Sequence, residues 1–356
     1  FRSQAAVRLG RKPVLMEVCG THTVAVSRSG LRGLLQDALE LKSGPGCPVC
    51  VTSQADIDRL IAIARLPGVT IATFGDMVRV PGSASSLEVE RAAGADVRII
   101  YSPLEAVNLA REHPEREVVL AGVGFETTAP AVALAIKEAA SQGIGNFSVL
   151  SLHKTMPPVL RTLLQDKELV LDGLILPGHV CTIAGRLPFD FIATDYGIPA
   201  AVTGFEPLDI LAALEVLLRQ AISGQPAVAN VYRRLVAEDG NARARAVLAE
   251  YFTPVEVMWR GLGSIPASGL QIAAPYRHFD AAHRFPVTPL TGSGFPGCRC
   301  GELLAGKISP PRCPLFARQC TPNHPVGPCM VSSEGACAAY YHYEHRAEVG
   351  NKPDGR

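Results

Sequence analysis

The stretch "EVVLAGVGFETTAPAVALAIKEAA" (Glu117–Ala140) decides the fold class. It begins with a short, continuously apolar run, which is typical of a strand covered on both faces of its sheet. A turn rich in glycine and threonine follows, and the remainder has the pattern of a helix. Because strands that feed directly into helices build parallel sheets, this stretch predicts an α/β protein.

The same alternation extends outward from about residue 13 to about residue 220. The other apolar runs that predict strands are "VLMEV" (14–18), "VTIATFG" (69–75), "VRIIYS" (97–102), "FSVLSLH" (147–153), "GLILPGH" (173–179), "FIATD" (191–195) and "AAVTGFE" (200–206). A weak internal echo relates "LMEVCGTHTVAV" (15–26) to "LAGVGFETTAPAV" (120–132), since each has a strand, a glycine, a threonine-rich turn and a helix start. The echo indicates either two related α/β domains or chance.

The sequence predicts two parallel-sheet α/β domains around a cleft, followed by a cysteine-rich C-terminal domain. The predicted bounds are 10–100, 101–225 and 226–350, with the strand and helix of 200–225 packing on the first domain as an alternative. The third region opens with a helical stretch, "VANVYRRLVAEDGNARARAVLAEYF" (228–252), and then becomes rich in glycine and proline. A segment with so few ways to build an apolar core needs a staple, and a metal centre supplies one.

Composition argues against several classes of protein. The chain has 356 residues, of which 47% are hydrophobic and 19% charged, and its formal net charge is +1. No basic tract argues for nucleic acid, and no apolar run reaches the roughly 18–20 residues that span a membrane. Ten cysteines in a chain of this length indicate metal binding or thiol redox chemistry in a reducing compartment rather than a secreted disulfide scaffold.

Six of the ten cysteines crowd into the C-terminal tail. Their spacing is Cys298-x-Cys300-x12-Cys313-x6-Cys320-x8-Cys329-x7-Cys337. Iron–sulfur clusters are usually held by four thiolates, and tetrahedral zinc can be held in the same way. One interpretation is therefore a four-thiolate zinc site with two ordinary buried cysteines. The interpretation that uses all six is a cluster with four ligands and a nearby redox pair, which stores the two electrons that one cluster cannot.

Cys19 lies between a predicted strand and a predicted helix in "EVCGTHT". We expect the positive end of the helix macrodipole to lower the pKa of its thiol and to favour an exposed thiolate. His22 is then a second ligand or a proton donor. The competing interpretation of Cys19 is a packed small hydrophobe, and packing is the role that we assign to Cys181 in "GHVCTIAG".

Cys47 and Cys50 form a C-x-x-C, and Ser53 with Asp56 gives an S-x-x-D helix start just after it. A dithiol ahead of a helix N-terminus is the thioredoxin-like arrangement. The alternative is half of a structural zinc site, but the sequence contains no second C-x-x-C to complete it. We therefore interpret the pair as redox-active.

Weaker polar signals follow other predicted strands, in "GFETT", "SLHKT" and "PGHV". The acid and threonines of "GFETT" either orient a ligand or cap the next helix. The histidine and lysine of "SLHKT" either bind an anion such as cyanide or thiocyanate or are ordinary loop residues. The histidine of "PGHV" has the same two interpretations. Ligands of α/β sheets bind at the carboxyl ends of strands, so we expect these groups and Cys19 to share a cleft at one sheet edge. The candidates are Glu126, Thr127, His153, Lys154 and His179.

The motifs "MEVCGTHT", "GPGCPVCVT", "GFETTAPA", "SLHKTMPP" and "PGHV", with the tail "CGELL…CPLF…CTP…GPCMVSSEGACAAYY", resemble the HypD family of [NiFe]-hydrogenase maturation factors. They run from Cys19 to Tyr341, which is nearly the whole chain, and no cysteine position departs from the family pattern. The resemblance implies two α/β domains flanking a cleft and a third domain that holds a [4Fe–4S] cluster.

The resemblance also implies the function and the roles of individual residues. It implies a cytoplasmic scaffold for the Fe(CN)2CO moiety of the hydrogenase, working with a HypC-type chaperone and a HypE-type cyanide donor rather than as a stand-alone enzyme. Cys19, with His22 beside it, then corresponds to the cysteine that binds the iron of the Fe(CN)2CO precursor. The cluster environment of the family is similar to that of ferredoxin:thioredoxin reductase. Carried onto this chain, it implies a redox pair of Cys300 and Cys329 and the cluster ligands Cys298, Cys313, Cys320 and Cys337.

Two other functions remain open on the sequence alone. The chain is alternatively a stand-alone iron–sulfur thiol–disulfide oxidoreductase, for which the additional iron ligand Cys19 would be unnecessary. A third interpretation is a non-redox binding module with structural zinc. Metal content separates the third interpretation from the others, and the role of Cys19 separates the first two.

Overall fold

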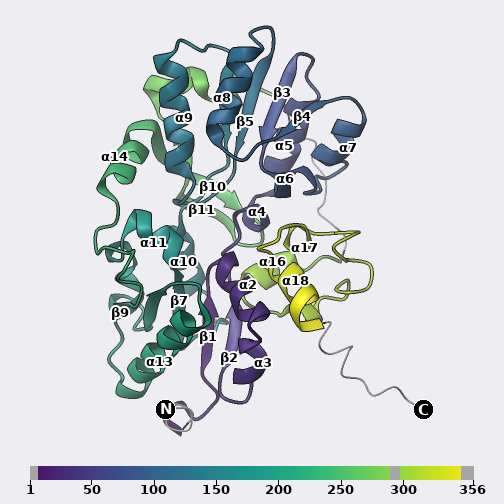
Figure 1. Ribbon diagram of the computed structural model, residues 1–356. Coiled ribbons are helices and arrows are strands. Elements are labelled where there is room, and N and C mark those ends of the chain that lie inside the picture. Colours follow the sequence, from purple (N-terminus) through teal and green to yellow (C-terminus); the bar gives the residue numbers. More distant parts are fainter. Residues whose placement is uncertain (1–6, 289–296, 346–356) are drawn as a thin grey trace, which may run out of the picture. The chain divides into compact units, whose positions relative to one another are not determined.

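The computed structural model describes residues 7–288 and 297–345, which divide into two compact units. Unit 1 combines Phe1–Cys50, Leu160–Asn241 and Gly297–Arg356. Unit 2 combines Val51–Val159 and Ala242–Pro296. In Figure 1 unit 1 therefore contains purple, teal and yellow segments, because parts of the chain that are distant in sequence fold together.

Unit 1 is built on a five-stranded parallel sheet with the order β2-β1-β7-β8-β9. Its strands are β1 (Val14–Glu17), β2 (Glu40–Ser43), β7 (Gly173–Pro177), β8 (Ala200–Thr203) and β9 (Val228–Asn230). Residues of β1, β7 and β8 are buried at every position, as their continuous apolar sequences predict for strands covered on both faces. Leu15 of β1 lies opposite Gly173 of β7, so the sheet joins segments about 160 residues apart.

Helices cover this sheet and pack a single apolar cluster against it. The cluster joins Leu15, Ile175 and Ala201 of the strands to side chains of α2 and α13. The helices of the α/β part are α2 (Gly20–Arg28), α3 (Leu31–Leu35), α4 (Pro48–Val51), α10 (Met156–Leu164), α11 (Gly178–Ala184), η1 (Leu187–Phe189), α12 (Phe191–Thr194) and α13 (Pro207–Ser223). The short helices α4 and α10 cross the boundaries of the unit.

The cysteine-rich tail belongs to unit 1 and contains only short helices. They are α16 (Cys300–Leu304), η3 (Pro310–Arg312), α17 (Pro328–Val331), α18 (Ala336–Ala339) and the π-helix η4 (Tyr340–His345). Helix α18 packs against α2, the helix that follows Cys19. The tail is thus part of the unit that holds Cys19, and it does not form a third compact unit.

Unit 2 is built on a four-stranded parallel sheet with the order β4-β3-β5-β6. Its strands are β3 (Val69–Thr73), β4 (Asp96–Ile99), β5 (Glu117–Gly122) and β6 (Phe147–Ser151), and an antiparallel hairpin adds β10 (Phe252–Trp259) and β11 (Gly263–Ile272). Its helices are α5 (Gln54–Ala64), α6 (Gly75–Val78), α7 (Leu87–Ala92), α8 (Pro103–Glu112), α9 (Ala129–Ser141), α14 (Ala242–Tyr251), η2 (Ala274–Phe279) and α15 (Ala281–Arg284).

Local sequence signals set the helix starts of unit 2, and apolar packing holds the helices in place. The hydroxyls of Ser53, Ser86 and Ser102 each accept a backbone N–H from the first turn of the following helix. Helices α8 and α9 lie side by side (Figure 1), and α9 also contacts α14. Their alanine-rich faces join Leu120 and Phe147 of the sheet in one buried cluster.

The structure confirms the α/β class with parallel sheets, but it differs from several detailed predictions. The predicted linear bounds of 10–100, 101–225 and 226–350 do not match the two units. The reason is that β1 pairs with β7, although all four strands of the unit 2 sheet lie between them in the sequence. The predicted strand 191–195 is helix α12, and the predicted helix 228–252 contains β9 and turns before α14. The hairpin β10–β11 was not predicted, since bulges and exposed positions hide its alternation. None of the helices in residues 7–288 and 297–345 is long and apolar enough to cross a membrane.

Candidate functional site

Cys19 occupies the junction between β1 and α2 in unit 1, as its place in the sequence predicts. Its backbone is extended, with φ −150° and ψ 125°, and it forms the N-cap of α2. The loop before α4 presses against this junction, because the N–H of Gly20 donates to the carbonyl of Gly46 at 3.0 Å. A Cβ atom on Gly46 would overlap the backbone of Cys19, so this close approach requires glycine.

Glu17 is the last residue of β1, two positions before Cys19, and is fully buried. Its carboxylate accepts the N–H of Cys19 at 3.1 Å and the hydroxyl of Thr23 at 2.6 Å. Burial raises the pKa of Glu17 to about 7. The sequence prediction missed this acid, although a glutamate that ends an otherwise apolar strand was a visible signal.

The prediction that Cys19 is an exposed thiolate is wrong. The side chain is only 7% exposed, and burial raises the pKa of its thiol to about 12. Hydrogen bonds from the first turn of α2 act in the opposite direction but do not offset burial, and the nearby negative charges of Glu334 and Glu17 raise the pKa further. Desolvation therefore outweighs the helix terminus at this position.

His22 lies one turn into α2 and is also fully buried. Its Nε2 lies 2.8 Å from the carbonyl oxygen of Gly204, so Nε2 must carry the proton and donate it. Nδ1 is then an unprotonated acceptor, and it has no hydrogen-bond partner among the described residues. Burial lowers the pKa of His22 to about 4, which keeps the ring neutral at physiological pH.

His179 and Phe205 complete the aromatic side of this site. The ring of Phe205 lies 4.6 Å from the ring of His22 and 4.0 Å from the ring of His179. His179 lies in the first turn of α11, after the carboxyl end of β7. Its side chain is exposed at the surface, and the burial of part of the ring lowers its pKa. The structure therefore brings His179, a predicted ligand-binding residue, to the same site as His22.

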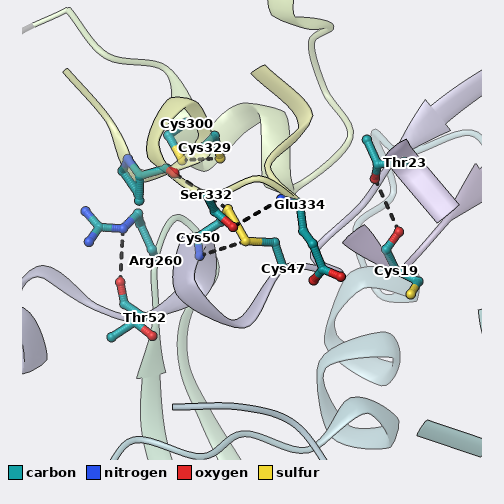
Figure 2. Close-up of a disulfide and its surroundings, with 11 residues drawn as sticks. Cys19, Thr23, Cys47, Cys50, Thr52, Arg260, Cys300, Cys329, Ser332 and Glu334 are labelled. Carbon is teal, nitrogen blue, oxygen red and sulfur yellow. Dashed lines mark hydrogen bonds between the residues drawn. A yellow bond between two sulfur atoms is a disulfide. The ribbon is translucent and has the colours of Figure 1, made fainter. Parts of the chain in front are cut away.

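The tail contributes Glu334, which the sequence prediction also missed. Its carboxylate accepts the hydroxyl hydrogen of Thr21 at 2.7 Å. A Cβ atom on Gly20 would lie 2.6 Å from the Cβ of Glu334, so the acid packs directly against the residue after Cys19. An acid in the apolar, cysteine-rich stretch "MVSSEGAC" was the available signal. Figure 2 shows Glu334 and Cys19 with the neighbouring thiols.

A disulfide joins Cys47, the residue before α4, to Cys50 within α4 (Figure 2). Both residues are buried, and the N–H of Cys50 points to the sulfur of Cys47 at 3.1 Å. The predicted S-x-x-D helix start is present, since the Ser53 hydroxyl accepts the N–H of Asp56 at 3.1 Å. The two cysteines precede α5 in the chain, as predicted, and the short helix α4 begins directly after Cys47.

All six tail cysteines line one small cavity, together with apolar side chains that include Phe316 and Met330. The sulfurs of Cys300 and Cys329 lie 2.8 Å apart, which Figure 2 marks with a dashed line. The Cys47–Cys50 disulfide lies close to this cavity, because the sulfur of Cys50 is 3.9 Å from the carbonyl oxygen of Pro328, the residue before Cys329. The remaining cavity cysteines are Cys298, Cys313, Cys320 and Cys337.

Burial controls ionisation in this cavity. It raises the pKa of Cys298 to about 12 and also raises that of Cys337. The pKa of Cys329 is raised chiefly by its hydrogen bond with Cys300. Within residues 7–288 and 297–345, no group of three His, Cys, Asp or Glu side chains is arranged to hold a single metal ion. The six sulfurs thus surround a volume and do not converge on a point.

The other predicted strand-end residues lie in unit 2, which corrects the prediction of a single sheet edge. Glu126 and Thr127 follow β5, and His153 and Lys154 follow β6, whereas Cys19 and His179 follow strands of the other sheet. The expected common edge fails because β3 to β6 form one sheet, whereas β1, β2 and β7 to β9, which come before and after them in the sequence, form another. Thr127 is half-buried, and the following Thr128 makes no side-chain cap on α9.

Glu126, His153 and Lys154 are all buried, so none of them is an ordinary loop residue. Glu126 accepts the N–H of Met156 at 2.8 Å, and burial raises its pKa to about 7. Burial lowers the pKa of His153 to about 3. One carboxylate oxygen of Glu126 and Nε2 of His153 lack hydrogen-bond partners in the part of the chain that the structure describes. Burial also lowers the pKa of Lys154, whose ammonium donates to the carbonyl of Met258 at 3.1 Å.

Cys181 lies in α11 and is fully buried in unit 1. Its position agrees with the packing role that the sequence suggested. The four cysteines outside the tail thus differ in their surroundings: Cys19 adjoins polar groups, Cys47 and Cys50 are paired, and Cys181 lies within the fold.

Fold and site together define an α/β protein in which a strand-end cysteine, a disulfide and a six-cysteine cavity occupy one unit. Sequence comparison identifies the particular family. The profile of the HypD family, described as "Hydrogenase formation hypA family", matches residues 2–344, and the chain belongs to this family.

Characterised relatives are similar over nearly their whole length. The hydrogenase maturation factor HypD of Rhodobacter capsulatus is 49% identical over 338 residues, which cover 93% of this chain and 90% of the relative. HypD of Escherichia coli (strain K12) is 44% identical over 333 residues, covering 93% and 89%. HypD of Rhizobium leguminosarum bv. viciae is 43% identical over 349 residues, covering 96% and 91%.

Proposed function

We propose that the protein is a hydrogenase maturation factor that holds iron while the Fe(CN)2CO moiety of a [NiFe] active site is assembled. Its family membership supports the general role. The observation that carries the detailed proposal is the succession of Cys19, the Cys47–Cys50 disulfide and the six-cysteine cavity within unit 1. A metal ligand and a store of electrons are what such an assembly requires.

Cys19 is the proposed ligand of the iron under construction. A sulfur donor suits low-spin iron with strong-field ligands, and coordination by a metal deprotonates a thiol whatever its pKa. The unpartnered Nδ1 of His22 is a second candidate donor or a proton acceptor in the same site. Because the Fe(CN)2CO unit brings most of its own ligands, the protein needs to supply few.

We propose that the tail cavity holds a [4Fe–4S] cluster rather than a single zinc ion. Six cysteines line it, but no three of the described side chains are arranged around one point. We propose Cys298, Cys313, Cys320 and Cys337 as the ligands of the cluster. A Cβ atom on Gly327 would lie 2.6 Å from the sulfur of Cys298, so glycine keeps the cavity open there. The cluster would supply electrons singly.

Two thiol pairs would convert single electrons into the electron pair that cyanide release needs. A thiocyanate, R–S–CN, gives R–S⁻ and CN⁻ when it accepts two electrons. In the proposed exchange, the Cys300–Cys329 dithiol reduces the Cys47–Cys50 disulfide and becomes a disulfide itself. The sulfur of Cys50 lies 3.9 Å from the carbonyl oxygen of Pro328, next to Cys329, and this proximity supports an exchange between the two cysteine pairs.

Unit 2 offers a second set of groups for small ligands. The unpartnered buried atoms of Glu126 and His153, with the buried ammonium of Lys154, support binding of a small anion such as cyanide or thiocyanate. Thr127 and the exposed His179 of unit 1 are proposed to orient ligands of the same chemistry. The HypC-type chaperone and the HypE-type cyanide donor are the proposed partners.

The test is anaerobic co-purification with both partners, followed by infrared spectroscopy and metal analysis. Bands of iron-bound cyanide and carbon monoxide would support the scaffold. An iron–sulfur protein that reduces disulfides but never carries these bands would instead be a stand-alone oxidoreductase. A protein with one zinc per chain and no sulfide would refute both redox functions.

A further inference from the structure

Two residues, Cys313 and Phe316, form a wall shared by two separate spaces in the tail. On the inner side they line the six-cysteine cavity. On the outer side they line a surface groove of about 320 Å³, which Pro311, Arg312 and Arg318 also border. Cys313 is partly exposed, unlike the buried Cys300 and Cys329. The groove therefore brings the surface of the protein within one side chain of the proposed cluster.

The rim of this groove is electropositive. Arg312 and Arg318 are both exposed, and neither has an ion-pair partner among the residues that the structure describes. Among the described residues that line the groove, the one acid is Glu344, which already accepts hydrogen bonds from Arg32 at 3.1 Å and from Ser27 at 2.6 Å. Two uncompensated guanidinium groups thus dominate the charge of the rim, and such a field attracts acidic partners.

The groove is held by a rigid loop. Arg312 ends the short 3-10 helix η3, which begins with two prolines. The N–H of Cys320 donates to the carbonyl of Leu315 at 2.9 Å, and Ala317 adopts the left-handed φ of 55° that the tight turn before Arg318 requires. A preformed surface loses little conformational entropy when a partner binds.

An aromatic group backs the shared wall. The ring of Phe316 lies 6.3 Å from that of Tyr341 and 5.8 Å from that of His345, and the last two rings are 5.7 Å apart. Phe316 itself is buried. Phe316 thus gives the wall of the groove an apolar side chain beside a basic rim, and interfaces commonly combine an apolar contact with a charged edge.

We propose that this groove is the docking site of an acidic redox protein that delivers single electrons to the cluster. The inference rests on the proposed function, because it presupposes a cluster behind Cys313 and Phe316. In each encounter the reduced partner loses one electron and the cluster gains one. Two encounters and two protons convert the Cys300–Cys329 disulfide into two thiols, which balances the electrons of the exchange described above.

The test uses the anaerobically purified full-length protein and a reduced acidic [2Fe–2S] ferredoxin as the probe. Rapid mixing measures the rate of cluster reduction from the visible absorbance. Replacing both arginines, R312E/R318E, should slow this rate about tenfold or more, since charge complementarity acts mainly on association rates. The R312K/R318K variant keeps the charge and should retain most of the rate.

Three controls separate docking from damage to the cluster. Reduced methyl viologen is a small cation that needs no docking surface, so it should reduce all variants at rates at least equal to that of the unaltered protein. The R219E/R233E variant carries the same change of net charge on two exposed arginines that do not line the groove, and it should behave like the unaltered protein. The ferredoxin rate should also fall with added salt, and this dependence should be weaker in R312E/R318E.

A second readout does not depend on electron transfer. Titration of the oxidised ferredoxin into the protein, followed by calorimetry, should give a dissociation constant that rises in R312E/R318E and not in R219E/R233E. Equal ferredoxin rates in these two variants, or equal slowing with methyl viologen, would overturn the docking site. If the unaltered protein lacked a cluster, the proposed function would fail, and the calorimetric comparison would still decide whether the groove binds an acidic redox protein.

Discussion

The thiol of Cys19 should react with alkylating reagents far more slowly than an ordinary cysteine when no metal is bound. Only the thiolate is a good nucleophile. Burial raises the pKa of this thiol from 9.0 to about 12. Because each pKa unit changes the ionised fraction tenfold, the shift leaves roughly a thousandfold less thiolate at neutral pH. The low exposure of the side chain, 7%, limits access further.

The assay is the rate of alkylation of the Cys19 peptide by iodoacetamide, followed by mass spectrometry over a series of pH values. In the native protein the rate should continue to rise with pH beyond 9, the ordinary value of the thiol pKa. In the denatured protein, where the thiol is solvated, the rate should level off near that value. A native rate that reaches its plateau below pH 9 would refute the conclusion that burial outweighs the helix terminus.

A matched pair of variants tests the electrostatic part of this reasoning. The negative charge of Glu334 raises the pKa of Cys19, so Glu334→Gln should lower that pKa and increase the alkylation rate. The amide oxygen of glutamine can still accept the hydroxyl of Thr21. Glu302→Gln is the control, because this tail acid is half-buried and paired with Arg299, and its charge is not among the causes of the pKa shift of Cys19. Equal rates in the two variants would contradict the assigned effect of Glu334.

Four further predictions remain, two on the metal centres, one on the disulfide and one on the second unit. Cys19→Ser should keep the fold and the tail cluster but lose the infrared bands of iron-bound cyanide and carbon monoxide, whereas Cys181→Ala should keep them; normal bands in Cys19→Ser would move the iron elsewhere. Anaerobic protein should contain about four iron and four sulfide per chain, and its Cys47–Cys50 peptide should gain two hydrogens reversibly on reduction, which thiol labelling and mass spectrometry can check. The pKa of Glu126 is raised from 4.5 to about 7 in the folded state, so its stabilising contribution is fully present below pH 4.5 and is lost as the pH rises to 7. Glu126→Gln should remove this loss, which is worth about 3 kcal/mol. Denaturant titrations at pH 4.5 and pH 8 measure the free energy of unfolding of both proteins. An equal fall in this free energy between the two pH values in both proteins would contradict the prediction.

Local patterns in the sequence determined the class of the fold and most of its strands. Continuous apolar runs such as "VLME" and "GLILP" became fully buried strands, because a run without polar residues can only be accommodated where both faces are covered. The motifs around Cys19 and the cysteines of the tail were sufficient to indicate the HypD family, which the comparisons confirm. The position of Cys19 between a strand and a helix was also predictable, since it lies after β1 and forms the N-cap of α2.

Only the tertiary structure decided which strands share a sheet and what surrounds each candidate residue. The pairing of Leu15 with Gly173 leaves no trace in the local sequence, and it separates Glu126 and His153 from Cys19. The same long-range packing buries Cys19, places the ring of Phe205 against those of His22 and His179, and brings Glu334 against Gly20. A residue type and its neighbours in sequence fix the ordinary pKa and the local helix field, but the desolvation that raises the pKa of Cys19 depends on segments about 160 and 315 residues away along the chain.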